Sequence, residues 1–113
     1  MQALGIIGGS GLTSLDALAV ERQEVVVTPY GDPSAPLTFG RFDGSPVVFL
    51  PRHGAGHTIP PHRVNYRANL WALKEAGVQR VVGMAAVGGI TPALAPGKLC
   101  VPDQVIDYTW GRE

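Results

Sequence analysis

The fold is indicated first by residues 3–12, which read ALGIIGGSGL. Residues 3–7 form a short apolar run with β-branched side chains, and the run stops at Gly8, Gly9 and Gly11. This pattern predicts a buried strand that leads directly into a tight glycine turn.

Strand and helix patterns then follow one another along the chain. Residues 64–76 contain strong helix formers and end before Gly77, which suits the position after a helix C-terminus. Apolar side chains recur at a helical spacing at Tyr66, Leu70 and Leu73. Residues 80–87 form another apolar run that stops at a glycine pair. The order of strand, helix and strand predicts a crossover connection and therefore an α/β fold.

A β-hairpin is predicted for residues 37–42 and 46–50. Asp43-Gly44 lies between these two runs, and this dipeptide suits the positive φ angles of a tight hairpin turn. A further strand is predicted at residues 25–28, and shorter extended segments are expected at residues 99–101 and 104–106.

Composition limits the class of protein. The 113 residues allow one domain or part of a larger one. A hydrophobic fraction of 45% with 16% charged residues is typical of a folded chain rather than a disordered one. A formal net charge of zero argues against bulk binding to nucleic acid or to an acidic membrane. Fifteen glycines and ten prolines predict many turns and argue against a helix bundle.

The cysteine count and the hydropathy indicate the compartment. Cys100 is the only cysteine, so it has no partner for an internal disulfide, which favours a reducing compartment. No apolar run approaches the length of a membrane span, and the N-terminal residues lack a basic region typical of a signal peptide. We therefore expect a cytoplasmic protein without a membrane partner.

Basic side chains gather in a part of the sequence without carboxylates. Residues 44–74 contain no Asp or Glu but include Arg52, His53, His57, His62, Arg63, Arg67 and Lys74. Arg52 and His53 come directly after the predicted strand at 46–50, and open α/β sheets bind ligands at such strand ends. A guanidinium offers two parallel donors to phosphate. The alternative is that both side chains only solvate a loop or pair with distant acids.

His57 lies four residues after His53, a spacing that two metal ligands adopt on a helix. Gly54 and Gly56 argue against a helix there, so we expect no metal site. His57 is either an ordinary loop residue or a further contact to the ligand.

The glycine turn at residues 8–11 is a second candidate for anion binding. Its glycines allow backbone N–H groups to converge on an anion, and Ser10 adds a hydroxyl donor. Neither the P-loop pattern nor the dinucleotide-binding fingerprint fits these residues. The small residues at 84–89 form a third candidate, where a ligand could meet the backbone closely or where simple packing explains the pattern.

These clusters, in this order, resemble the purine nucleoside phosphorylase and methylthioadenosine phosphorylase family. The resemblance is carried by residues 6–12, by Pro51-Arg52-His53-Gly54 with His57, and by residues 64–73, VNYRANLWAL. Residues 107–113, DYTWGRE, are similar to the bacterial branch that acts on S-methyl-5′-thioinosine. The resemblance runs over the whole chain but covers about the first half of the family's length.

The resemblance implies a mixed central β-sheet flanked by helices, and an activity that uses inorganic phosphate to release a purine from a nucleoside. No organic cofactor or metal is implied. Phosphate would be bound by Ser10, Arg52, His53, Ala85 and Ala86, with His57 as a further substrate contact. Ser10 stands where the family more often has Thr, and Ala85 stands where relatives carry Thr or Asn. No catalytic residue is assigned within the chain.

The resemblance also implies how the chain is organised. Residues 1–113 are expected to form one incomplete domain that holds the phosphate site, because the family's base-recognition groups come mostly from later segments. The chain also ends without a polar tail or a capping element, as expected of a fragment. A full-length protein would be a homotrimer that takes phosphate and a purine nucleoside. Two alternatives remain, a non-catalytic phosphate-binding fragment and a histidine phosphatase, in which His53 would be phosphorylated.

Overall fold

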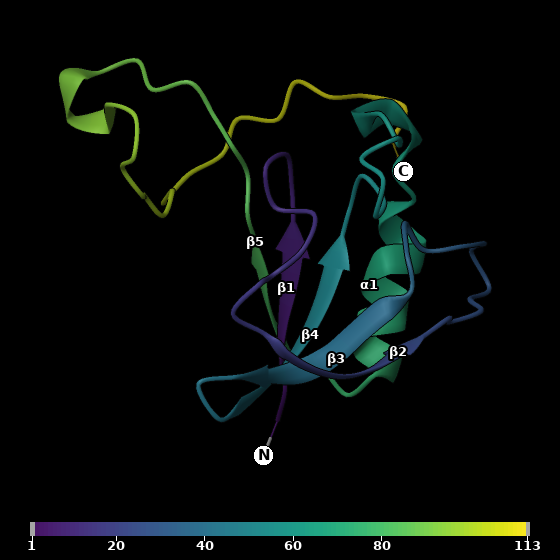
Figure 1. The fold of residues 1–113 in the computed structure, drawn as a ribbon. Helices are drawn as coiled ribbons and strands as arrows, with labels where there is room; N and C mark the ends of the chain where they lie inside the picture. Colours follow the sequence, from purple (N-terminus) through teal and green to yellow (C-terminus); the bar gives the residue numbers. More distant parts are fainter. Residues whose placement is uncertain (1, 113) are drawn as a thin grey trace.

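The computed structural model of the protein describes residues 2–112. Within these residues, five strands form one mixed sheet in the order β2-β3-β4-β1-β5 (Figure 1). The strands are β1 (Leu4–Gly8), β2 (Ala19–Glu24), β3 (Leu37–Phe42), β4 (Ser45–Pro51) and β5 (Arg80–Gly83). β1 runs parallel to both of its neighbours, β4 and β5, whereas β2, β3 and β4 pair in antiparallel fashion. The predicted α/β fold with a mixed sheet is confirmed.

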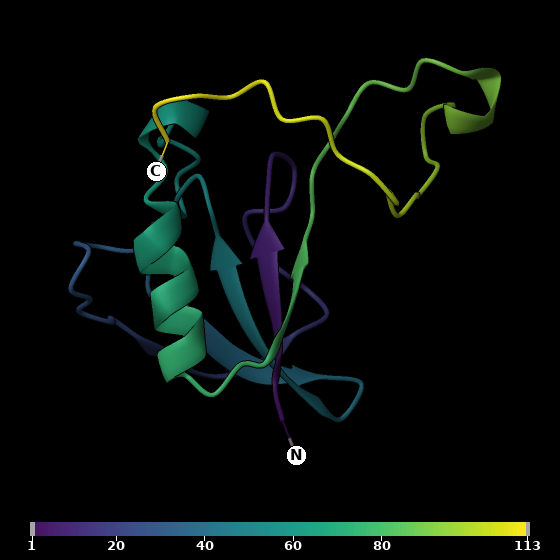
Figure 2. The ribbon, with the colours of Figure 1, turned by 180° about the vertical axis from the view of Figure 1, so that it is seen from behind.

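Helix α1 (Tyr66–Glu75) packs on one face of the sheet (Figure 2). It begins where the Asn65 side chain accepts a hydrogen bond from the backbone N–H of Ala68, which satisfies one of the free donors of the first turn. It ends before Gly77, whose φ of +86° is the left-handed conformation that glycine adopts after a helix. The predicted helix is confirmed with slightly shorter bounds. Two single-turn helices, η1 (Pro61–Arg63) and η2 (Pro92–Leu94), complete the regular structure of residues 2–112.

Strand β4 forms the centre of the hydrophobic core. Because side chains alternate along a strand, Val48 and Leu50 face α1 and cluster with Leu73, whereas Val47 and Phe49 face the opposite side. On that opposite side the segment between β1 and β2 crosses the sheet (Figure 1) and contributes the buried Leu18. Burial on both faces explains why β4 is a nearly continuous apolar run in the sequence.

The predicted hairpin is confirmed between β3 and β4. Asp43 and Gly44 have φ angles of +50° and +81°, which are the two positive values that a type I′ turn requires. Phe42 pairs with Ser45 across this turn.

The strand predicted at residues 25–28 is wrong, because the structure places β2 at residues 19–24 instead. The last pair between β2 and β3 joins Glu24 to Leu37, where β3 begins, so residues 25–27 have no neighbouring strand. Thr28 makes only an isolated bridge to Gly31. Every residue of β2 is exposed, and an exposed edge strand carries no apolar alternation that a sequence pattern could detect.

The strand predicted at residues 80–87 is confirmed only as far as Gly83. Gly83 pairs with Ile7, and the N–H of Met84 donates one last hydrogen bond to the carbonyl of Ile7. Beyond this point β1 has entered its glycine turn, so the chain has no strand to pair with. The segments expected at residues 99–101 and 104–106 are not strands either, because no strand within residues 2–112 lies beside them.

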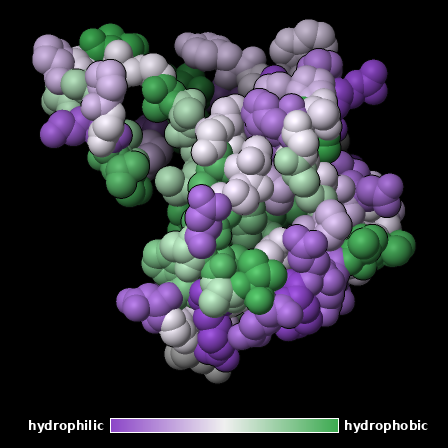
Figure 3. Space-filling view, viewed as in Figure 1, coloured by the Kyte–Doolittle hydropathy of each residue, from purple (hydrophilic) through white to green (hydrophobic). Residues whose placement is uncertain are grey.

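Residues 84–112 form an extended arm that leaves β5, turns at η2 and returns across the carboxyl ends of the central strands (Figure 1). Its side chains are exposed, and Figure 3 shows apolar residues on its surface. The most exposed apolar side chains of this arm are Ile90, Leu99, Val101, Tyr108 and Trp110. Within residues 2–112, no helix combines the length and the apolar character needed to cross a membrane.

Candidate anion site

The candidate site lies at one edge of the sheet. β1, β4 and β5 are parallel neighbours, so their carboxyl ends reach the same edge (Figure 1). The glycine turn follows β1, Arg52 and His53 follow β4, and the segment that begins at Met84 follows β5. All three sequence clusters that suggested ligand binding therefore start from one place, as is usual for ligand sites of open α/β sheets.

The turn after β1 is tight enough to need glycine. The N–H of Leu12 bonds to the carbonyl of Gly9 at 3.0 Å, and Gly11 has a φ of +82°. A side-chain carbon on Gly8 would overlap the carbonyl oxygen of Leu12 and touch the Phe49 ring. The turn leaves Ser10 exposed at its tip.

Arg52 links the ends of all three strands. Its backbone N–H bonds to the carbonyl of Gly8 at 3.0 Å, and Nη1 donates to the carbonyl oxygen of Met84 at 2.6 Å. Its guanidinium covers Gly9 so closely that a side-chain carbon there would overlap it. Within residues 2–112 the ion pairs are Arg22–Glu24, within β2, and Arg41–Glu21, between β3 and β2, so Arg52 has no carboxylate partner in the described chain.

His53 is only 7% exposed and is held by the loop that follows it. Its Nδ1 lies 2.8 Å from the carbonyl oxygen of Ile59. Since a carbonyl oxygen only accepts, Nδ1 carries the hydrogen of this bond. Nε2 is therefore the remaining ring nitrogen, and it donates to an anion only when the ring is doubly protonated. The backbone carbonyl of His53 accepts from the N–H groups of Thr58 and Ile59, which closes the loop.

His57 lies against both Ser10 and His53. The Ser10 hydroxyl is 3.2 Å from Nε2 of His57, and the two imidazole rings are 5.2 Å apart between centroids. His57 also adopts a positive φ of +53°, which is uncommon for a residue other than glycine. The structure thus brings together Ser10, Arg52, His53 and His57 from two loops.

Ala85 and Ala86 follow Met84 at the same edge, in an exposed segment without regular structure. Met84 is fixed on both sides of its peptide: its N–H bonds to Ile7 at 2.8 Å and its carbonyl accepts from Arg52. The two alanines therefore start from an anchored position beside the guanidinium.

The remaining basic residues lie elsewhere. His62, Arg63 and Arg67 line a separate hollow together with Gly111 and Arg112, and Lys74 lies in the last turn of α1. The basic side chains of residues 44–74 are thus divided between the carboxyl ends of the central strands and the surface of η1 and α1.

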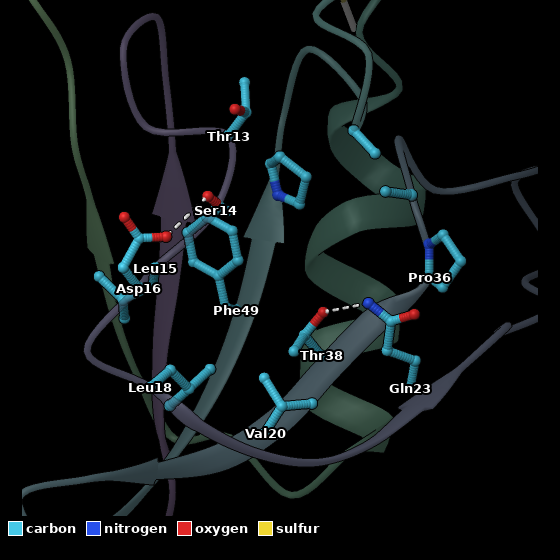
Figure 4. Close-up of a pocket in the computed structure, with 13 residues that line it drawn as sticks. Thr13, Ser14, Leu15, Asp16, Leu18, Val20, Gln23, Pro36, Thr38 and Phe49 are labelled. Atoms are coloured by element: carbon cyan, nitrogen blue, oxygen red, sulfur yellow. Dashed lines mark hydrogen bonds between the residues drawn. The ribbon is translucent and has the colours of Figure 1, made fainter.

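A larger hollow of about 700 Å³ opens on the sheet face opposite α1 (Figure 4). It is lined by the segment after the glycine turn and by residues of β2, β3 and β4, including Phe49 and Val20. Its one charged lining residue is Asp16, whose carboxylate bonds to the Ser14 hydroxyl at 3.4 Å. A negative charge disfavours an anion, so this hollow is not the candidate phosphate site.

Sequence reasoning missed three groups that hold the site. The carbonyl of Met84 is a backbone group, so no residue type in the sequence could reveal its contact with Arg52. Asn69 and Ser34 bond to each other, and the Ser34 hydroxyl donates to the carbonyl of Arg52. Asn69 could have been noticed as a polar residue between the small apolar residues Ala68 and Ala72, on the buried side of α1. Among residues 2–112, no group of three or more His, Cys, Asp or Glu side chains could hold a metal ion.

Comparison with known proteins identifies what this arrangement is similar to. Residues 3–113 match the family model described as the phosphorylase superfamily. The chain is 50% identical, over its full length, to a probable S-methyl-5′-thioinosine phosphorylase of Pseudomonas syringae pv. tomato, of which it covers 46%. It is 54% identical over 110 residues to a purine nucleoside phosphorylase of Streptomyces coelicolor, with 96% of this chain and 38% of that protein covered.

A solved structure shares the same fold. Methylthioadenosine phosphorylase from Schistosoma mansoni, in complex with adenine, superposes with a TM-score of 0.93 at 44% identity. The match covers 100% of this chain and 41% of that one. The chain thus spans less than half the length of these relatives.

Proposed function

Because this chain belongs to the phosphorylase superfamily, we propose that it carries the phosphate site of an enzyme that cleaves S-methyl-5′-thioinosine or methylthioadenosine by phosphorolysis. In this reaction a phosphate oxygen forms a bond to the anomeric carbon of the sugar, and the bond from that carbon to the purine nitrogen breaks. The products are the free purine and 5-methylthioribose 1-phosphate. The names of the relatives from Pseudomonas syringae and Schistosoma mansoni support this substrate class.

One observation carries the proposal: Ser10, Arg52 and His53 come together where three parallel strands end, and the Arg52 guanidinium has further N–H donors besides the one bonded to Met84. We assign the anion to Arg52, His53 and the hydroxyl and backbone of Ser10, with backbone contacts from Ala85 and Ala86. His57 is assigned as a further substrate contact beside Ser10, because its Nε2 lies 3.2 Å from the Ser10 hydroxyl. Such a transfer needs an oriented anionic nucleophile more than a protein nucleophile, because the sugar develops positive charge as the base departs. The reaction needs no organic cofactor or metal.

Further properties of the whole protein are also proposed. Residues 1–113 are assigned as the N-terminal, phosphate-binding portion of one domain, supported by coverage of 46% and 38% of two relatives. The family resemblance supports a homotrimer, and the single Cys100 supports a cytoplasmic location. Sedimentation at three times the mass of one chain would agree with the trimer, and a monomeric mass would exclude it.

Phosphate dependence tests the reaction. The complete protein that carries this chain is incubated with either methylthiopurine nucleoside, with and without inorganic phosphate, and free base and sugar phosphate are measured by chromatography. We expect base release only with phosphate, in equal amounts with the sugar 1-phosphate. Release at the same rate without phosphate would identify a hydrolase and contradict the proposal.

The second candidate function is a non-catalytic phosphate-binding fragment, favoured by the small share of the relatives that the chain covers. Residues 1–113 and the complete protein are compared in the same assay, together with a direct titration of phosphate. Binding by both with turnover by the complete protein alone would assign the fragment function to residues 1–113.

A further inference from the structure

A chain of partly buried hydrogen bonds runs from α1 to the backbone of Arg52. Nδ2 of Asn69 donates to Oγ of Ser34 at 3.0 Å, and Oγ of Ser34 donates to the carbonyl oxygen of Arg52 at 2.6 Å. Oδ1 of Asn69 accepts in return from the backbone N–H of Ser34 at 2.8 Å. Asn69 is only 2% exposed and Ser34 is half-buried, so water has little access to the amide at the helix end of this chain of bonds.

The direction of each bond is determined by the groups involved. The Asn69 oxygen is occupied by the N–H of Ser34, and its NH₂ group is a donor. The Ser34 oxygen therefore accepts from Asn69, and its single hydrogen points to the carbonyl of Arg52. The amide in α1 thus determines the orientation of a hydroxyl outside the helix.

The position of Asn69 makes this arrangement informative. Its neighbours on the buried side of α1 are Ala68, Ala72 and Leu73, and the latter two belong to the hydrophobic core. A polar group on such a face is costly unless its hydrogen bonds are formed, and an apolar side chain would pack there without this requirement. The bonds that offset this cost all go through Ser34 toward Arg52.

We propose that Asn69 and Ser34 are positioning residues of the phosphate site, an inference that rests on the function proposed above. The carbonyl of Arg52 belongs to the peptide group that joins Arg52 to His53. Holding this carbonyl holds the plane of that peptide, and with it the relative direction of the two anion-binding side chains. The guanidinium is aligned with Met84 and the imidazole with Ile59 from the two sides of the same peptide.

Two variants interrupt the chain of bonds in different ways. Ser34→Ala removes the hydroxyl, and Asn69→Asp keeps the shape but replaces the amide donor by an acceptor that draws the Ser34 hydrogen away from Arg52. In the complete protein we expect each variant to raise the KM for phosphate about threefold to tenfold, the range of a lost hydrogen bond. The kcat at saturating phosphate and the KM for the nucleoside should change less than about twofold, because no contact to the sugar or base is altered.

Three further variants distinguish a specific effect on the phosphate site from a general loss of stability. Ser34→Thr retains a hydroxyl and should restore the KM for phosphate. The double variant Ser34→Ala/Asn69→Asp should match the single variants rather than multiply their effects, because both act through one bond to Arg52. Ala72→Gly is the matched control: Ala72 is fully buried in α1, so its loss lowers the midpoint of thermal unfolding, but it lies outside the chain of bonds and should leave the KM for phosphate unchanged.

The outcomes distinguish the two proposals. Phosphate-dependent wild-type protein with an unchanged KM for phosphate in Ser34→Ala and Asn69→Asp would overturn the positioning role and leave the function intact. An increase in KM of equal size in Ala72→Gly would overturn it too. A wild-type protein that neither binds nor uses phosphate would overturn the proposed function, and this inference with it.

Discussion

The guanidinium of Arg52 donates a 2.6 Å hydrogen bond to the carbonyl oxygen of Met84. This bond spans β1, because Arg52 follows β4 on one side and Met84 follows β5 on the other. It uses one of five guanidinium hydrogens and fixes the plane of the group, so the other donors are oriented before an anion arrives.

Replacement of Arg52 tests whether this orientation serves an anion. Arg52→Lys retains the charge, but an ammonium cannot hold Met84 and present a two-pronged donor at once. We expect phosphate affinity to fall by about 1–3 kcal/mol, as measured by titration or by the KM for phosphate. Arg41→Lys is the control, because Arg41 pairs with Glu21 on the exposed surface of β3. An unchanged phosphate affinity in Arg52→Lys would show that Arg52 does not hold the anion.

Gly9→Ala tests the contact between the glycine turn and Arg52. The added methyl group would overlap the guanidinium, which must move away from Met84. We expect phosphate affinity to fall by about 1–3 kcal/mol, the cost of disturbing a charged hydrogen bond. Gly83→Ala is the control, since nothing lies within 4 Å of a side-chain carbon at Gly83. Equal affinities of the two variants would show that the guanidinium tolerates displacement.

The state of His53 separates a phosphorylase from a histidine phosphatase. In a phosphorylase, phosphate attacks the sugar and His53 only contacts the anion, so no step leaves phosphorus on the protein. Rapid quenching at neutral to alkaline pH with phosphate-ester substrates, followed by intact-mass measurement, should show no added phosphoryl mass. A substrate-dependent phosphoryl group mapped to His53 would contradict the phosphorylase assignment.

Two leucines of α1 test which face of the helix is buried. Leu73 is 1% exposed and contributes to the core, whereas Leu70 is 54% exposed. We expect Leu73→Ala to lower the free energy of unfolding by about 2–5 kcal/mol and Leu70→Ala by less than about 1 kcal/mol. Denaturant titration of both variants measures the difference. Equal losses would mean that Leu70 is covered in the protein in solution.

The turn at residues 107–109 predicts a titration effect. A hydrogen bond from the Thr109 hydroxyl, and a second from its backbone N–H, hold the pKa of Asp107 below its usual range. Thr109→Val removes the hydroxyl, so this pKa should rise toward the ordinary value in an NMR titration of the carboxyl carbon. Thr91→Val on the same arm is the control and should leave the pKa of Asp107 unchanged.

The sign of the linked stability follows from this direction. A depressed folded-state pKa means that the Asp107 contribution is present above the unfolded pKa and is lost as pH falls through the folded value. The turn should therefore loosen only in acid, below the usual range for Asp. Loosening of the turn near neutral pH would contradict this assignment of its cause.

The parts of the fold that could be predicted are those in which local chemistry and burial agree. β4 is buried on both faces, and Asp43-Gly44 satisfies the backbone of one specific turn, so the hairpin was predicted correctly. β2 could not be predicted because its exposed residues pair with β3 through backbone bonds that any sequence can form. Its location depends on where β3 begins, which is a tertiary property.

The same distinction applies to the helix and to the site. The spacing of Tyr66, Leu70 and Leu73 correctly predicted a helix, yet of the three only Leu73 is buried, because Ala68 and Ala72 allow α1 to approach the sheet on another side. Arg52, His53 and Ser10 were found from residue type and from strand ends. Asn69 was missed because its role depends on contact with Ser34, which lies 35 residues away in the sequence.

The place of β1 in the sheet has a consequence for synthesis on the ribosome. β1 is made before the other strands of this sheet, but its partners lie far along the chain, with Leu4 paired to both Val47 and Arg80. Its apolar residues remain without both neighbours until β5 has left the exit tunnel, and such long-range parallel pairing is intrinsically slow. The glycine turn and the Arg52 contacts that depend on β1 therefore form late, so the nascent chain exposes an aggregation-prone strand before it can bind any anion.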